Sequence, residues 1–229
     1  MPRTPRILIV GGGIGGLAAA LALERQRAEV IVCEQSPKLF EIGAGIGLAP
    51  NAIKALRALG LEDEINAAAY ASEFAVIRSW RDGREISRSY QGDYREKFGA
   101  PSVTIHRADL LGILAGALRT ANIRLGLRCA AVEPRASGAV ARFADGTEIE
   151  ADLVIGADGI HSKVRESLFG ADAPRFTGCI CFRGMAPADA VPRDINTAAV
   201  NIVDGAARTC GALSRAPRRA SQHRRPHRQ

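Results

Sequence analysis

The sequence has few of the features that mark secreted or metal-binding proteins. Its 229 residues include five cysteines, an odd number without the dense spacing of a disulfide framework. The two nearest, Cys179 and Cys181, are separated by one residue, which is closer than the spacing of two or more that zinc sites use. We therefore expect free thiols in a reducing, cytoplasmic setting and no metal site.

No hydrophobic run is long enough for a membrane span. The non-polar stretch Ile7–Leu23 covers 17 residues and contains five glycines within residues 11–16. A transmembrane helix needs about 20 apolar residues. Glu24 and Arg25 follow directly, which is unlike the flank of a signal-peptide cleavage site. We expect no membrane span.

Acidic residues are absent from the last 22 positions. The formal net charge of +7 comes entirely from this end, because residues 208–229 hold seven arginines and no acid, whereas residues 1–207 balance 24 basic with 24 acidic side chains. The same segment has no aromatic residues to stack on bases. We therefore expect no specific nucleic-acid binding, with non-specific binding through the basic tail as an alternative.

What the chain does have is enough apolar sequence for a large core, with 47% hydrophobic and 24% charged residues. Arg6–Val10 and Glu29–Cys33 are β-branched runs typical of buried parallel strands. The alanine-rich segment Leu17–Arg27 between them predicts a helix. The pattern predicts an α/β, Rossmann-like domain with a parallel sheet that begins with a right-handed strand–helix–strand unit.

Later segments predict a β-hairpin and a β-meander inserted into this domain. Arg81-Asp82-Gly83 is a turn signal between two strands, Phe74–Trp80 and Arg84–Arg88. Glycine-containing turns separate three further strands, expected at Leu125–Val132, Ala139–Phe143 and Thr147–Ile149. The remaining expectations are a glycine-rich connection at Gly43–Gly47, a buried strand at Ala151–Ile155, a helix at Ser162–Leu168 and a strand at Cys179–Met185.

A glycine-rich loop follows the first predicted strand. Gly11, Gly13 and Gly16 satisfy the G-x-G-x-x-G spacing between a buried strand and a helix. The first glycine permits a tight turn, the second lets the backbone approach a pyrophosphate, and the third allows close helix packing. The helix N-terminus attracts phosphates, and Glu34, after the second strand, can accept hydrogen bonds from both hydroxyls of a ribose. A bound dinucleotide is therefore favoured over a plain tight turn.

Four stretches in a fixed order resemble the FAD-dependent aromatic hydroxylases, which are single-component flavoprotein monooxygenases. They are ILIVGGGIGGLAAALAL, EIGAGIGLAPNAIKALRALGL, HRADLLGIL and DLVIGADGIHSKVR. The chain is most similar to the branch that includes salicylate, 3-hydroxybenzoate and 6-hydroxynicotinate hydroxylases. The resemblance implies FAD and NADH or NADPH as cofactors, and a small phenolic-acid-type substrate and O2 as partners.

The resemblance also implies a set of cofactor-binding residues. They are Gly11, Gly13, Ile14, Gly15, Gly16, Glu34, Gln35, Gly45, Ile46, Gly47, Arg107, Cys129, Asp158 and Gly159. Within this set, Glu34 would hold the adenosine ribose, and the strip from Gly45 to Gly47 would run beside the flavin. Arg107 would lie along the ribityl–pyrophosphate portion. Asp158, which on its own could be a helix-capping acid, would contact the cofactor.

The resemblance assigns no catalytic residue. Some relatives have a catalytic histidine at the position of Gly47, where this chain offers no base. His106 and His161 have no obvious catalytic partner and are expected to be structural, whereas Lys163 and Arg165 would lie near the nicotinamide phosphates. In the implied reaction, hydride from NADH or NADPH reduces FAD, O2 forms a flavin C4a-hydroperoxide, and its distal oxygen attacks the phenolic ring.

The resemblance ends near residue 203. We expect an incomplete FAD-binding domain over residues 1–178, the start of a substrate domain over 179–203, and an arginine-rich tail over 204–229 that is disordered or read out of frame. Family members continue well beyond this length, so the substrate domain would be largely missing. An inactive truncated fragment is one alternative, and a geranylgeranyl-reductase-like or squalene-epoxidase-like flavoprotein is another. The oligomeric state is not predicted.

Overall fold

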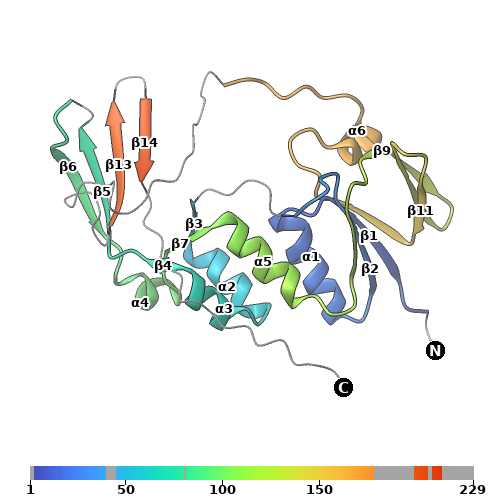
Figure 1. Cartoon of the computed structure of the whole chain (residues 1–229), viewed down its shortest axis with the longest axis horizontal. Coiled ribbons are helices and arrows are strands. Elements are labelled where there is room, and N and C mark those ends of the chain that lie inside the picture. Colours follow the sequence, from blue (N-terminus) through green and yellow to red (C-terminus); the bar gives the residue numbers. More distant parts are fainter. Residues whose placement is uncertain (1–2, 40–44, 80, 178–198, 206–207, 213–229) are drawn as a thin grey trace. The chain divides into compact units, whose positions relative to one another are not determined.

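The chain folds into two compact units. The first contains residues 1–44, 56–61 and 107–184, and the second contains residues 45–55, 62–106 and 185–229. The computed structural model describes residues 3–39, 45–79, 81–177, 199–205 and 208–212 (Figure 1). Helix α2 (Pro50–Ala58) begins in the second unit and ends in the first.

The first unit is built on a four-stranded parallel sheet. Its strands are β1 (Arg6–Val10), β2 (Glu29–Cys33), β8 (Asn122–Arg124) and β12 (Leu153–Gly156), in the order β12-β1-β2-β8. β1 and β2 have the bounds that the β-branched runs predict, and they pair in parallel with Ile7 opposite Val30. This arrangement confirms the expected Rossmann-like α/β class.

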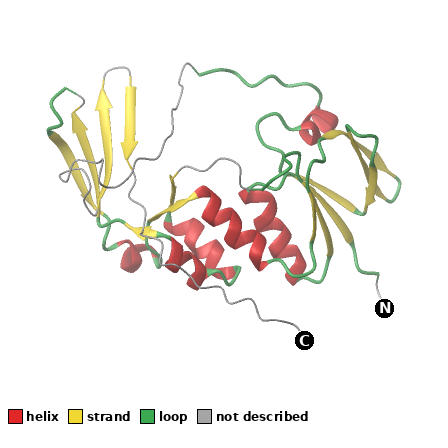
Figure 2. Cartoon of the chain, viewed as in Figure 1, coloured by secondary structure: helices red, strands yellow, loops and turns green. Residues whose placement is uncertain are grey.

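The two faces of the sheet are covered differently (Figure 2). Leu8 and Val10 belong to a core shared with an antiparallel meander of β9 (Cys129–Arg135), β10 (Gly138–Phe143) and β11 (Glu148–Ala151). Because strand side chains alternate, Ile7 and Ile9 face the other side. That side is covered by α1 (Ile14–Arg25), which in turn contacts α5 (Arg107–Ala117).

A short helix, α6 (Lys163–Phe169), follows β12 and joins the meander side of the core. Val164 is buried in that core. The Ser167 hydroxyl accepts a hydrogen bond from the Val132 backbone N–H at 3.0 Å, which links α6 to β9. The turn between β12 and α6 is therefore anchored at one end by the pairing of β12 with β1 and at the other by the packing of α6 against the core.

Among its described residues, the second unit contains two sheets and two complete short helices, in addition to the start of α2. β3 (Gly45–Leu48), β7 (Val103–His106) and β4 (Tyr70–Ala71) form an antiparallel sheet in the order β3-β7-β4. β5 (Phe74–Ser79) and β6 (Glu85–Tyr90) form the predicted hairpin, and β13 (Ala199–Gly205) pairs with β5 in parallel. The remaining elements are β14 (Arg208–Ala212), α3 (Glu62–Ala68) and α4 (Tyr94–Phe98).

Two expectations about local structure are wrong. The strand expected at Leu125–Val132 is broken, because Gly126 has a φ of 75° and the loop around it hydrogen-bonds to the backbone of Glu34 and Ser36. The expected glycine-rich connection is a strand from Gly45 onward. It forms because its backbone groups hydrogen-bond to β7, which lies far away in the sequence.

β14 lies within residues 204–229, the segment predicted from the sequence to be an arginine-rich tail. Residues 213–229 and the strand expected at Cys179–Met185 lie outside the described residues.

Candidate dinucleotide-binding site

The turn from β1 into α1 requires glycine at two positions. Gly11 has a φ of 110°, and a Cβ placed on it would overlap the Ala157 carbonyl oxygen. A Cβ placed on Gly16 would overlap the Gly11 carbonyl oxygen. The Gly11 N–H donates to the Cys33 carbonyl at 2.8 Å, which fixes the turn to the end of β2. The structure thus supports the tight-turn and close-packing roles that the spacing predicts for these two residues.

Two other glycines at this turn face open space, whereas a Cβ on Gly12 would lie tightly against Glu34 and Leu39. A Cβ on Gly13 or Gly15 would meet no atom within 4 Å. Gly13 is the N-cap of α1, and no side chain caps it. The first turn of α1 also has no acidic residue. The positive end of the helix dipole is therefore not neutralised by a carboxylate in its first turn, and it is suited to bind a phosphate group.

Glu34 is fixed beside this loop by two backbone groups. Its Oε2 accepts the Gly12 N–H at 2.7 Å, and its Oε1 accepts the Ser36 N–H at 2.8 Å. Each carboxylate oxygen has a second lone pair, so the side chain can also accept hydrogen bonds from a ligand. Gln35 is exposed next to it. This geometry fits the ribose-binding role that the sequence predicts for Glu34.

Asp158 caps α6 through both of its carboxylate oxygens. Oδ1 accepts the Ser162 hydroxyl at 2.6 Å, and Oδ2 accepts the backbone N–H groups of Lys163 at 2.6 Å and Val164 at 3.2 Å. The capping role considered from the sequence is therefore present. The cofactor contacts predicted for Asp158 and for Gly159, whose φ is 78°, remain predictions.

The basic residues after Asp158 are engaged within the same segment. Lys163 pairs with Glu166, with its Nζ 2.6 Å from Oε2. Arg165 donates to the Ile160 carbonyl at 2.8 Å. Both side chains are close to the turn at Asp158 in sequence, and their approach to nicotinamide phosphates remains a prediction.

The predicted flavin-side residues divide between the two units. Gly45, Ile46 and Gly47 form most of β3 in the second unit, where they pair with β7. Arg107 is the first residue of α5 in the first unit. His161 is exposed, whereas the Nδ1 atom of His106 is buried and has no hydrogen-bond partner.

The two cysteines whose side chains the structure describes, Cys33 and Cys129, are unsuited to nucleophilic chemistry. Burial raises the pKa of the thiols of Cys33 and Cys129 to about 11, so both are protonated near neutral pH. Cys129 lies in the core between the parallel sheet and the meander. Its predicted contact with the cofactor, which remains untested, would have to come from its backbone.

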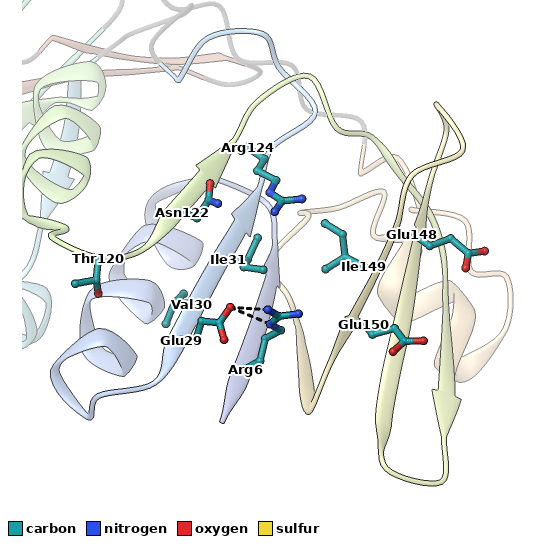
Figure 3. A pocket seen from close by; sticks show the side chains of 10 residues that line it. All are labelled: Arg6, Glu29, Val30, Ile31, Thr120, Asn122, Arg124, Glu148, Ile149 and Glu150. Carbon is teal, nitrogen blue, oxygen red and sulfur yellow. Dashed lines mark hydrogen bonds and ion pairs between the residues drawn. The ribbon is translucent and has the colours of Figure 1, made fainter. Parts of the chain in front are cut away.

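A cavity of about 430 Å³ lies elsewhere in the first unit. Figure 3 shows the ion pair between Arg6 and Glu29 among the lining side chains. Arg6, Glu29 and Asn122 begin strands of the parallel sheet, whereas the glycine loop follows the carboxyl end of β1. Parallel sheets bind nucleotides at their carboxyl ends, so the glycine loop is the candidate site.

No group of three or more potential metal ligands occurs within the described part of the chain. Across those same residues, no helix is both long and apolar enough to cross a membrane.

Comparison with known proteins identifies the family. A family profile described as an FAD binding domain matches residues 4–187, which is more than half of the chain. The chain belongs to this family. The match includes the glycine loop, Glu34 and Asp158, and FAD is the cofactor for which the family is named.

The relatives in this family include aromatic hydroxylases. 3-Amino-4-hydroxybenzoate 2-monooxygenase from Streptomyces cremeus is 44% identical over 191 residues, which are 83% of this chain and 48% of that protein. 6-Hydroxynicotinate 3-monooxygenase from Pseudomonas fluorescens is 39% identical over 188 residues, 82% of this chain and 49% of that protein. These names confirm the resemblance to FAD-dependent aromatic hydroxylases.

Solved structures agree with this assignment. 2,6-Dihydroxypyridine-3-hydroxylase from Arthrobacter nicotinovorans has a TM-score of 0.71 and 26% identity, with 89% of this chain and 50% of that chain covered. The chain spans about half the length of the curated relatives it matches.

Two features of the candidate dinucleotide-binding site were not predicted from the sequence. Ser162 is the N-cap of α6, and its hydroxyl accepts the Arg165 N–H at 2.9 Å while donating to Asp158. Ser162 is the first residue of the helix predicted at Ser162–Leu168, and a serine at a helix start is a recognised capping signal that could have revealed this role. The backbone bond from Gly12 to Glu34 has no sequence signal, because any residue supplies an N–H.

Proposed function

We propose that this chain binds FAD through its glycine loop and forms the flavin-binding part of a hydroxylase that acts on a small phenolic-acid-type aromatic compound. The observation that carries the proposal is the fixed pair of Gly12 and Glu34 next to the uncapped N-terminus of α1. This pair places a hydroxyl-binding carboxylate beside a phosphate-binding helix end, which matches the adjacent ribose and diphosphate of an adenosine diphosphate group.

The residues present fit FAD in a second respect. Gly13 and Gly15 leave open space in front of α1, where side chains would obstruct a pyrophosphate. The resemblance adds Gly45, Ile46 and Gly47 beside the flavin ring, and a built Cβ at Gly47 also meets no atom within 4 Å. When bound and reduced by NADH or NADPH, FAD supplies the activation of O2 that hydroxylation needs.

The chain's own contribution to this chemistry is binding and orientation. Glu34 holds the ribose hydroxyls, and the N-terminus of α1 holds the pyrophosphate. The bare backbone of β3 accommodates a flat ring. His161 and the buried thiols of Cys33 and Cys129 take no part, and no residue of this chain is assigned as the base that deprotonates the phenol.

The decisive experiment changes the charge at the pyrophosphate position without disturbing the fold. Gly13 is extended, with a φ of −73°, and has open space around it, so a side chain fits there. Gly13→Asp would cap α1 well but would repel a phosphate, whereas Gly13→Ser is an equally good cap without charge. FAD affinity is measured by quenching of flavin fluorescence, and stability by thermal unfolding of the apoprotein.

We expect the wild-type chain to retain FAD after desalting. Gly13→Asp should lose FAD binding by at least about a hundredfold while unfolding no earlier than wild type, and Gly13→Ser should bind far better than Gly13→Asp. Equal FAD affinity in all three proteins would contradict the proposed site. Oxidation of NADH or NADPH that a phenolic acid stimulates then tests the hydroxylase activity itself.

A further inference from the structure

One face of the β3-β7-β4 sheet in the second unit contains two glycines. β3 and β7 pair antiparallel, with Gly45 opposite His106 and Gly47 opposite Thr104. Residues directly opposite each other in an antiparallel pair project from the same face. His106 and Thr104 therefore share this face with two glycines, which add no side chain to it.

Open space lies beside Gly47 on this face, although Thr104 on the same face is buried. A Cβ built on Gly47 would meet no atom within 4 Å. On the other side of β7, Tyr70 lies opposite Thr104, and the Thr104 hydroxyl donates to the Tyr70 carbonyl at 3.5 Å. The hydroxyl of Thr104 is thus satisfied within the sheet. The Nδ1 atom of the neighbouring His106 has no such partner.

The Nδ1 atom of His106 is buried and lacks a hydrogen-bond partner. Buried polar atoms in folded proteins nearly always have a partner, and an exception requires an explanation. Within the described part of the chain, one other buried side-chain atom is in this condition, Asp93 Oδ1. The second oxygen of that carboxylate forms an ion pair with Lys97, so His106 is the more exceptional case.

We propose that His106 is a flavin-binding residue whose Nδ1 atom forms a hydrogen bond with bound FAD. This inference rests on the proposed function, because the resemblance places the strip from Gly45 to Gly47 beside the flavin. From the sequence His106 is expected to be structural, but a buried structural histidine would have its hydrogen-bond partner within the protein. The open space beside Gly47 leaves room for part of a flat ring, and the polar atoms of flavin supply the missing partner.

Three substitutions separate a flavin contact from a structural role. His106→Leu removes both ring nitrogens. His106→Asn keeps a polar atom near the position of Nδ1, and His106→Gln places one near the position of Nε2 instead. FAD dissociation constants come from fluorescence titration, and the flavin absorption bands report the environment of the ring. Thermal unfolding of each apoprotein reports the fold.

We expect His106→Leu and His106→Gln to weaken FAD binding about tenfold, and His106→Asn to weaken it less than threefold. The apoprotein of His106→Leu should unfold at the wild-type temperature or above it, because the unpaired nitrogen is gone. Unchanged FAD affinity in all three variants would overturn the role of His106 and leave the proposed function intact. A lower unfolding temperature with unchanged affinity would make His106 structural, and a wild-type chain that binds no FAD would overturn both proposals.

Discussion

Glu34 and Gly12 are joined by a hydrogen bond of 2.7 Å from the Gly12 N–H to the Glu34 carboxylate. The acid that follows β2 therefore positions the loop that precedes α1, in addition to its proposed role in binding the ribose. Because one side chain serves both purposes, its substitution should affect FAD binding and loop stability together.

Glu34→Gln should weaken FAD binding about tenfold or more, because the amide presents a donor to one of the two backbone N–H groups that the carboxylate accepts. We expect the free energy of unfolding to fall by about 1 kcal/mol as well. Fluorescence titration and urea unfolding measure the two effects. The matched control is Glu29→Gln at the start of the same strand, where an exposed ion pair with Arg6 contributes little. Equal effects of the two substitutions would contradict the assignment.

Gly16→Ala should destabilise the apoprotein by about 3 kcal/mol or more, because its Cβ would overlap the Gly11 carbonyl. The neighbouring Gly15→Ala has open space around it and adds a better helix former, so it should be neutral or stabilising by up to about 1 kcal/mol. Urea unfolding of the two apoproteins checks the difference. The prediction fails if the two alanine variants are equally stable.

Asp158 and Ser162 should behave as one cap for α6. Each alanine substitution should lower the free energy of unfolding by about 1–2 kcal/mol, since each removes an acceptor for N–H groups in the first turn. The double substitution should cost less than the sum by about 1 kcal/mol, because the Ser162 hydroxyl also donates to Asp158. Strict additivity in this double-mutant cycle would show that the two side chains act independently.

Glu24 should make stability depend on pH in the acidic range. Burial opposes ionisation of its carboxyl, but the backbone N–H groups of Thr120, Ala121 and Arg119 favour it more strongly, so its pKa lies below the ordinary value of 4.5. A group with a lowered pKa stabilises the fold above its unfolded value and loses that contribution as the pH falls through its folded value. The unfolding temperature of wild type should therefore exceed that of Glu24→Gln at pH 7, and the gap should close below about pH 4.5.

Thermal unfolding of both proteins from pH 7 to pH 3 measures this gap. Glu64→Gln, on the exposed side of α3, controls for the loss of a surface carboxylate. A gap between wild type and Glu24→Gln that stays constant down to pH 3 would rule out the contribution of Glu24.

The parallel sheet and its loop were predictable because their signals are local. β1 and β2 are β-branched runs bounded by glycines or charges. The glycine spacing is a recognisable local motif, and Gly16 is required by the Gly11 carbonyl five residues away, although Gly11 is required by the distant Ala157 carbonyl. β3 was not predictable, because Gly45 and Gly47 have no strand propensity of their own and pair with β7 almost sixty residues later. The unpaired nitrogen of His106 depends on the same pairing, so the sequence offered no signal for it.

β12 ends the parallel sheet, and within the described residues its one strand neighbour is β1. Leu153 on this strand is 50% exposed. A terminal strand has backbone N–H and C=O groups on its outer side that can hydrogen-bond to another strand. That strand can come from the same chain or from a second molecule. Purified protein should therefore sediment faster as its concentration rises, and Leu153→Lys should suppress that association without lowering FAD affinity.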